Sequence, residues 1–318
     1  MNRPVRELED LVSGRHATSA LAPKATISVV VVVYRTGPAL ENCIACILKD
    51  PDTFELILVD NGSSPQEAGW MQAAAATHAK VKLLVGHGNV GFAQGANLGV
   101  RASSGQVVVF VNPDAFVQPG CLSTLREGVG QGPRPCLIGA RILNADGGEQ
   151  RGARRGEVTP MTTLFSILRL THVLKVLSRF EIHHENDPTP EGRIEVPTIS
   201  GAGFAMTRED FDRLGGFDED YFLHVEDIDL CWRVRQAGGK VWFDPSANLV
   251  HLGSTSLSNP MKIEVWKGVG LIRYFRKRAT NPIQAGVAIA LAPAILAAAI
   301  VRALLRKRTR KVDQPQSI

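Results

Sequence analysis

The sequence has few of the groups that mark a secreted or zinc-bound protein. Its 318 residues include five cysteines, an odd number, and only Cys43 and Cys46 stand close together. No second Cys or His pair follows at the spacing of a zinc site, so we expect buried thiols. The first ten residues are too charged for the apolar region of a signal peptide. These absences favour a chain that works in the reducing cytoplasm.

Excess charge of one sign is absent from most of the chain. The formal net charge is +5, and residues 302–318 alone hold six Lys or Arg against one Asp. Residues 1–301 are therefore balanced. A nucleic-acid-binding domain needs a basic surface, so we expect no nucleic-acid partner.

Long apolar runs are also scarce. Residues 285–301 form one run of 17 apolar residues that includes Pro293, at the lower limit of the roughly 17 to 25 needed to cross a bilayer. Basic residues flank it on both sides, which disfavours a simple crossing. We expect residues 261–318 to form a helical, basic, membrane-associating tail that lies in the interface or re-enters at Pro293, on the inner face of the plasma membrane. A helix packed in the protein core is the alternative.

What the sequence does contain is a regular alternation of strand and helix patterns. After a polar arm over residues 1–25, apolar β-branched runs alternate with helical spacing four times by residue 111. This pattern predicts an α/β fold with right-handed crossovers and a doubly wound, mostly parallel sheet. The expected strands are 27–33, 54–59, 81–85 and 106–111, and the expected helices are 38–48, 65–77 and 92–103.

Polar side chains follow two of these strands. Asn112, Pro113 and Asp114 come after an unbroken apolar run, and Asp60 ends the second strand. Ligands of open α/β sheets bind at the carboxyl ends of strands, where Asp114 suits a divalent cation on a phosphate and Asp60 suits a ribose or a pyrimidine N–H. Ordinary turns, with a helix cap after Asp60, are the alternative.

A glycine-rich turn at residues 87–99 leads into the third expected helix. Glycines allow close approach of a ligand, and a helix start favours the negative charge of a diphosphate. The segment is neither a nucleoside triphosphatase loop nor a dinucleotide fingerprint. It therefore indicates a different diphosphate ligand.

Acidic residues gather at 218–229, where Glu226 and Asp227 open a helix. Capping alone explains acids in a first helical turn, but six acids in twelve residues exceed that need. A carboxylate general base is the functional interpretation. Further on, His251 ends an apolar strand before a polar loop, so a ligand role is as plausible there as a structural one.

In this order, the motifs resemble those of inverting family-2 glycosyltransferases, specifically their rhamnosyltransferase-like branch, over about residues 26–255. The resemblance implies a GT-A fold, a nucleotide-sugar donor and a divalent metal, Mg²⁺ or Mn²⁺. Asn112 stands where many relatives have the first Asp of an Asp-x-Asp motif. The resemblance implies these roles: Asp227 and Glu226 catalytic; Tyr34, Asp60, Asn89, Gly91, Asn97 and Asn112 donor-binding; Asp114 and His251 metal-binding.

The resulting hypothesis is a GT-A domain at 26–260, with a nucleotide-binding half at 26–115 and an acceptor and catalytic half at 116–260. Its function would be inverting transfer of a sugar, such as rhamnose from dTDP-rhamnose, to a glycan or polyprenyl-diphosphate-linked acceptor in cell-envelope polysaccharide synthesis. A nucleotidyltransferase and a catalytically silent glycan-binding scaffold are the alternatives.

Overall fold

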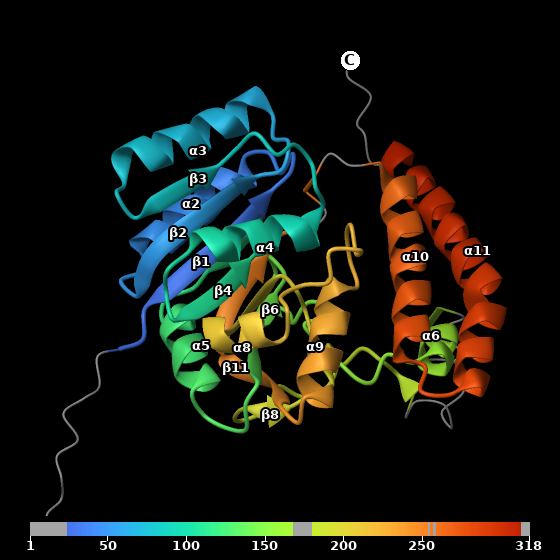
Figure 1. Cartoon of the computed structure of the whole chain (residues 1–318). Helices are drawn as coiled ribbons and strands as arrows, with labels where there is room; N and C mark the ends of the chain where they lie inside the picture. The colour runs from blue at the N-terminus through green and yellow to red at the C-terminus, as the bar shows by residue number, and fades with distance from the viewer. Residues whose placement is uncertain (1–23, 168–179, 254, 257–258, 313–318) are drawn as a thin grey trace, which may run out of the picture.

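A computed structural model describes residues 24–167, 180–253, 255–256 and 259–312 (Figure 1). The expected arm at 1–25 lies outside the described residues except for its last two. All five cysteines are free thiols, and Cys46 alone among them is partly exposed. The prediction of a buried thiol is therefore confirmed for Cys43 and wrong for Cys46.

The first half of the chain forms the expected alternation of strands and helices. Four parallel strands pair in the order β3-β2-β1-β4. The predicted element ends agree with the structure to within one or two residues. The elements are β1 (Ile27–Val33), α2 (Ala39–Lys49), β2 (Thr53–Asp60), α3 (Pro65–Thr77), β3 (Val81–Leu84), α4 (Phe92–Ala102) and β4 (Val107–Val111).

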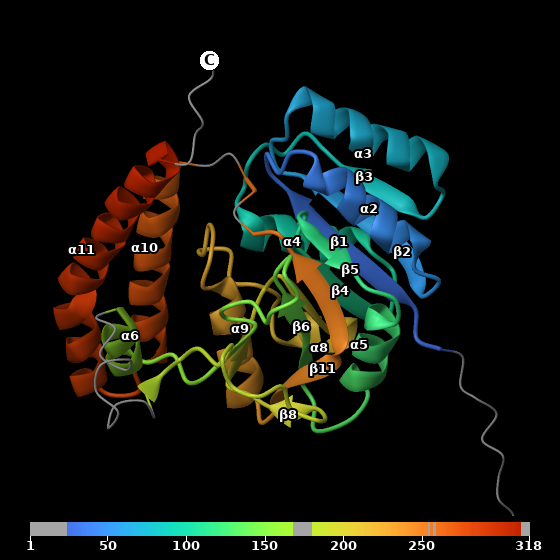
Figure 2. The ribbon, with the colours of Figure 1, turned by 180° about the vertical axis from the view of Figure 1, so that it is seen from behind.

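Helices cover both faces of the sheet (Figures 1 and 2). Successive residues of a strand point to opposite faces, so Val29 and Val31 pack in one apolar core and Val30 and Val32 in the other. The first core also contains side chains of α2, α3 and α5, and the second contains those of α4, α8 and α9. This packing explains why β1 is apolar at almost every position.

The second half of the sheet is mixed, which corrects the expectation of a mostly parallel sheet. The order continues β4-β10-β6-β11-β5, with β8 also paired to β11, and only the β6 and β11 pairing is parallel. The chain leaves β6 at the carboxyl edge and returns from that edge into β10, which must therefore run antiparallel. The elements are β5 (Ala115–Val117), α5 (Cys121–Val129), β6 (Cys136–Leu143), β8 (Ile194–Glu195), β10 (Gly203–Thr207), α8 (Arg208–Arg213), α9 (Glu226–Gln236) and β11 (Lys240–His251).

Besides β8, three short elements of the described chain lie between β6 and β10. Strands β7 (Arg154–Arg155) and β9 (Thr198–Ile199) form a separate two-stranded sheet, and α6 spans Pro160–Ile167. Residues 168–179, which follow α6, lie outside the described residues.

The C-terminal region is a helical hairpin beside the sheet (Figures 1 and 2). Helices α10 (Pro260–Arg278) and α11 (Pro282–Val312) pack along each other, and α11 also contacts α6. Helix α11 runs through Pro293 and buries Ala288 and Ile295, but Ile283 and Ile289 are 78% and 61% exposed. Among the described residues, no helix combines the length and apolar character that a bilayer crossing requires.

Candidate active site

Two adjoining cavities open at the carboxyl edge of the sheet. The larger, about 510 Å³, is lined from the first half of the chain by Tyr34, Asn89 and Gly91. The smaller, about 410 Å³, is lined by Glu226 and Asp227 at the start of α9. The residues shared by the two linings are Phe92, Asn112, Leu223, His224, His251 and Lys267.

The wall of the larger cavity is a set of turns held by side-chain amides. Asn89 Oδ1 accepts a hydrogen bond from Gly91 N at 3.1 Å, and Asn61 Nδ2 donates to Gly91 O at 2.8 Å. Gly91 has φ of 87°, and a Cβ there would lie 2.5 Å from Phe222 O. Only glycine therefore lets the turn approach the Phe222 loop this closely.

Asp60 ends β2 and organises the following turn. Its Oδ1 accepts hydrogen bonds from Gly62 N at 3.0 Å and Ser63 N at 2.8 Å. Both bonds go to one oxygen, so Oδ2 remains able to accept a bond from a ligand. Asp60 is thus a turn residue that lines neither cavity, and its free Oδ2 makes it a candidate contact only for a ligand that reaches this turn.

Asn97 is the one predicted donor-binding residue with an entirely internal hydrogen-bond set. Its Nδ2 donates to Phe217 O and Glu219 Oε1, both at 2.9 Å, and its Oδ1 accepts from Phe217 N at 2.9 Å. The side chain is buried and lines neither cavity. Its contacts fasten α4 to the loop before α9, so the structure does not bring Asn97 to a ligand.

Asp114 and His251 meet although they are far apart in sequence. Strand β5 pairs antiparallel with β11 so that Ala115 lies opposite His251, which places His251 Nε2 3.1 Å from Asp114 Oδ1. Thr255 Oγ1 donates to Asp114 Oδ2 at 2.9 Å. Burial alone would raise the pKa of Asp114, but the hydrogen bond and charge of a protonated His251, together with the bond from Thr255, outweigh burial and hold it below its usual value.

Gln150 fixes the proton on His251. Gln150 Oε1 lies 2.6 Å from His251 Nδ1, and Gln150 Nε2 donates to His251 O at 3.0 Å, which sets the direction of the amide. In a neutral ring, Nδ1 therefore carries the hydrogen and Nε2 carries the lone pair. Asn112 Nδ2, 3.2 Å from Nε2, is the matching donor.

This arrangement fits a divalent metal. The Nε2 lone pair and the Asp114 carboxylate are both acceptors, so a cation or a proton between them is needed to relieve their repulsion. Mg²⁺ and Mn²⁺ accept carboxylate and imidazole ligands and complete their shells with phosphate oxygens and water. Within the described ranges, no three His, Cys, Asp or Glu side chains form a metal-binding group. Ligand phosphates would have to supply the remaining coordination.

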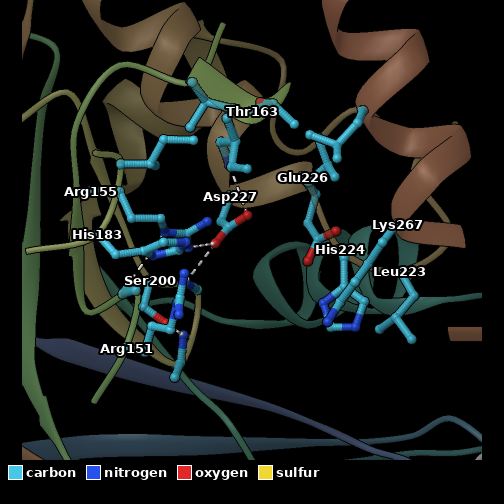
Figure 3. Close-up of a pocket in the computed structure, with 18 of the residues that line it drawn as sticks. Arg151, Arg155, Thr163, His183, Ser200, Leu223, His224, Glu226, Asp227 and Lys267 are labelled. Carbon is cyan, nitrogen blue, oxygen red and sulfur yellow. Dashed lines mark hydrogen bonds and ion pairs between the residues drawn. The ribbon is translucent and has the colours of Figure 1, made fainter. Parts of the chain in front are cut away.

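In the smaller cavity, Asp227 is held by the protein and Glu226 is not (Figure 3). Asp227 Oδ2 accepts from Arg155 Nη2 at 2.8 Å and from Gly201 N at 3.0 Å. Glu226 is buried and its Oε2 has no hydrogen-bond partner. Burial, followed by the charge of Asp227, raises the pKa of Glu226 to about 8.

The loop before these acids is strained. His224 and Val225 have φ of 67° and 77°, and a β-branched residue rarely adopts such values. The ion pairs of Lys277 with Asp218 and Asp229, both 2.8 Å, connect this loop and α9 to α10. Asp218 and Asp229 therefore hold the loop and α9 in place against α10. Backbone strain such as that at His224 and Val225 is typical of ligand sites.

Three residues of the site were not identified from the sequence. Asn61 stood beside Asp60, but Gln150 and Arg155 lay in a segment without a recognisable motif. Gln150 is 101 residues from His251, and Arg155 is 72 from Asp227. No local signal links partners so distant in sequence, although two adjacent arginines in a glycine-rich loop were a sign of an anionic partner.

The chain belongs to glycosyl transferase family 2, whose pattern it matches over residues 28–215. A second match, to the N-terminal domain of galactosyltransferase, covers residues 182–253. The protein is therefore a glycosyltransferase, and the predicted enzyme class is confirmed.

Among named relatives, the chain is similar to an N-acetylglucosaminyl-diphospho-decaprenol L-rhamnosyltransferase of Mycobacterium tuberculosis. They are 29% identical over 237 residues, which is 71% of this chain and 75% of the relative. A low-salt glycan biosynthesis hexosyltransferase of Haloferax volcanii is 25% identical over 66% of this chain and 62% of its own. The resemblance to the rhamnosyltransferase-like branch is confirmed.

Solved glycosyltransferase structures share the fold. GalNAc-T7, crystallised with UDP, GalNAc and Mn²⁺, matches with a TM-score of 0.60 at 20% identity, over 79% of this chain and 48% of that chain. The chain thus spans about half the length of that protein. The mannosyltransferase PcManGT of Pyrobaculum calidifontis, in complex with GDP-Man and Mn²⁺, matches with a TM-score of 0.55 at 18% identity, over 90% and 76%.

Proposed function

We propose that this glycosyltransferase transfers a sugar, with inversion, from a nucleotide-sugar donor in the larger cavity to an acceptor hydroxyl in the smaller one. The observation that carries the proposal is the shared wall between the cavities. Asn112 and His251 line both, so a donor and an acceptor bound on either side would meet there. Attack from the side opposite the departing diphosphate gives inversion in one displacement.

The donor cavity offers contacts for each part of a nucleotide sugar. Tyr34 lines it beside the turn at Gly62, and with Asp60 Oδ2 it suits the base and ribose. Asn89 and Gly91 shape the turn into the amino terminus of α4, where partial positive charge favours a diphosphate. Asn112 lies next to His251, toward the reacting end.

Asp114 and His251 would hold Mg²⁺ or Mn²⁺, with Gln150 keeping the imidazole in its ligand tautomer. A bound divalent cation supplies stabilisation of the negative charge on the leaving diphosphate. The two neighbouring structures contain Mn²⁺, which supports this assignment.

Asp227 is the proposed general base. Asp227 is held in place by Arg155 and Gly201 N, whereas burial raises the pKa of Glu226 to about 8 and so keeps it protonated, and unable to act as a base, near neutral pH. Protonated Glu226 can donate a hydrogen bond to the acceptor. The pair thus divides into a proton acceptor and a proton donor.

For the substrates, we propose rhamnose from dTDP-rhamnose and a glycan or polyprenyl-diphosphate-linked acceptor of cell-envelope polysaccharide synthesis. The support is the similarity to a rhamnosyltransferase acting on N-acetylglucosaminyl-diphospho-decaprenol. A nucleotidyltransferase would use Asp114 and Asp227 as joint metal ligands. Their partners favour separate roles, since Asp114 contacts His251 and Asp227 pairs with Arg155.

We further propose peripheral attachment to the cytoplasmic face of the plasma membrane through α11. Ile283, Val287 and Ile289 are exposed apolar side chains on this helix, and basic residues follow at 302–311. Each basic residue near an anionic leaflet adds about 1 kcal/mol of attraction. Ile283→Gln with Ile289→Gln should reduce sedimentation with anionic vesicles, while Phe54→Gln, at another exposed apolar position, on β2, should not.

The test of the function is a screen of nucleotide sugars with and without Mg²⁺ or Mn²⁺. We expect one donor to raise the melting temperature in a metal-dependent manner, and to yield nucleoside diphosphate and an inverted glycoside, read from anomeric coupling constants. Pyrophosphate release would instead support nucleotidyl transfer. The absence of any turnover with any donor would support a silent scaffold.

A further inference from the structure

We propose that the smaller cavity contains an anion subsite, formed by Arg151 with His183 and Arg155, that binds a phosphate group of the acceptor. This inference rests on the proposed function, because it assigns the smaller cavity to the acceptor. The ligand class is an amphiphile with a phosphate next to its reacting sugar.

Unpaired polar atoms line this cavity. The Thr163 side chain is 94% buried and its Oγ1 has no hydrogen-bond partner, and the same holds for the buried atoms His183 Nδ1 and Glu226 Oε2. Buried polar groups are nearly always hydrogen-bonded, and each orphan is costly. Three such atoms in one cavity indicate a polar ligand rather than an apolar one.

Two arginines stand on one side of this cavity. Figure 3 shows Arg151, Arg155, His183 and Ser200 together there, with Asp227 paired to Arg155, and Glu226, His224 and Lys267 on the other side. Burial, then the charges of Arg151 and Arg155, lowers the pKa of His183 to about 4. The imidazole is therefore neutral in a field that attracts anions.

Of the two arginines, Arg151 is the more available to a ligand. Its ion pair with Glu185 is long, with Nε 3.8 Å from Oε1, and the side chain is 54% exposed. Arg155, by contrast, is committed to Asp227 and to Ile199 O. A phosphate on Arg151 would lie in the same cavity as the base Asp227, as expected for an acceptor whose sugar is bonded directly to its phosphate.

The remaining wall of the cavity is apolar and includes the C-terminal hairpin. Val158, Ile182, Leu271 and Ile295 line it, the last two from α10 and α11. This wall suits the alkyl chain that follows the phosphate of a lipid-linked sugar. The same phosphate chemistry could come from a membrane lipid headgroup, so the experiment separates the two sources.

The decisive experiment compares two acceptors that differ only in phosphate: N-acetylglucosaminyl diphosphate undecyl ester and undecyl N-acetylglucosaminide, both without membranes. We expect Arg151→Gln to raise KM for the first by about 10-fold or more, as for a lost bond to a charged group, and KM for the second by less than twofold. Arg151→Lys should restore part of the difference. Arg101→Gln is the matched control, because Arg101 is similarly exposed (59%) with a similarly long ion pair (3.6 Å).

A binding measurement tests the anion subsite without requiring any turnover. Undecyl diphosphate, titrated by calorimetry in saturating nucleoside diphosphate and Mg²⁺, should bind the wild type at least about 10-fold more tightly than Arg151→Gln. If binding is lost but no donor is ever turned over, the subsite stands and the proposed function fails. Equal losses with both acceptors, or an effect seen only with phospholipid vesicles, would overturn the subsite.

Discussion

Two buried glutamates lie at opposite edges of the sheet, and one has a structural role whereas the other lines the candidate active site. At the amino edge, Glu55 accepts hydrogen bonds from Ser28 Oγ at 2.6 Å and Gly105 N at 3.2 Å, and pairs with Lys82 at 2.7 Å. At the carboxyl edge, Glu226 Oε2 has no partner. Both side chains are at least 94% buried, so burial does not distinguish them.

The pKa values of these two glutamates move in opposite directions. Burial would raise both, but the bonds from Lys82, Ser28 and Ser104 lower the pKa of Glu55 to about 2, whereas burial and Asp227 raise that of Glu226 to about 8. A carboxylate satisfied by the protein holds strands together. One left unsatisfied costs stability and is available for a ligand.

The largest effect is expected at Asp227, the acid that is both held by the protein and open to the cavity. Asp227→Asn should reduce turnover by about 10² to 10⁴, the usual contribution of a general base, and leave donor binding nearly unchanged. Steady-state kinetics and donor calorimetry check this. Near wild-type turnover would transfer the role of base to Glu226 or Asp229.

The second-largest effect is expected when the Asp114 carboxylate is removed from the proposed metal site. Asp114→Ala should weaken metal-dependent donor binding more than His251→Ala, because Mg²⁺ and Mn²⁺ prefer carboxylate to imidazole. Donor affinity is measured over a metal titration for both variants. Activity undiminished by EDTA would remove the metal from the mechanism.

At the amino edge, Glu55→Gln should lower the free energy of unfolding by about 2 to 3 kcal/mol at pH 7. The folded pKa lies below the ordinary value of 4.5, so this stabilisation is present above about pH 4.5 and is lost as pH falls toward 2. Urea unfolding at pH 7 and pH 3 should show the difference shrinking. Glu41→Gln, an exposed position on α2, is the control, and a pH-independent loss would contradict the assignment.

Gln150 affects the proposed metal site through His251, to which its side chain is hydrogen-bonded. Gln150→Leu should weaken Mn²⁺ binding by about 10- to 100-fold, as is usual when the partner of a histidine ligand is lost. Gln150→Glu, which keeps an acceptor for Nδ1–H, should retain most of the affinity. Paramagnetic resonance of Mn²⁺ with nucleoside diphosphate measures this, and equal loss in both variants would indicate a merely structural role.

The smallest effect is expected at Glu226, with the opposite sign to Glu55. Because its folded pKa is raised, its protonated form is stable below about pH 4.5 and its penalty grows as pH rises toward 8. Glu226→Gln, which mimics the protonated acid, should stabilise the protein by about 1 to 2 kcal/mol at pH 7 and leave stability unchanged at pH 4. A destabilised variant at pH 7 would show that Glu226 is satisfied after all.

Local sequence was a good guide to the first half of the fold. The apolar β-branched runs and the caps around residues 27–111 identified every strand and helix there, because each element forms from neighbouring residues and packs on both faces. The second half was harder. Nothing local showed that β10 runs antiparallel between β4 and β6.

The sequence by itself determined which side chains stand at strand ends: Asp60, Asn112, Asp114 and His251 each follow an apolar run, and parallel strands share one carboxyl edge. Only the tertiary structure decided the pairs. Asp114 meets His251 across 137 residues through the β5 and β11 register, and Arg155 reaches Asp227 from a separate two-stranded sheet. Periodicity depends on neighbours in the chain, whereas an ion pair depends on how distant segments pack, which no local pattern encodes.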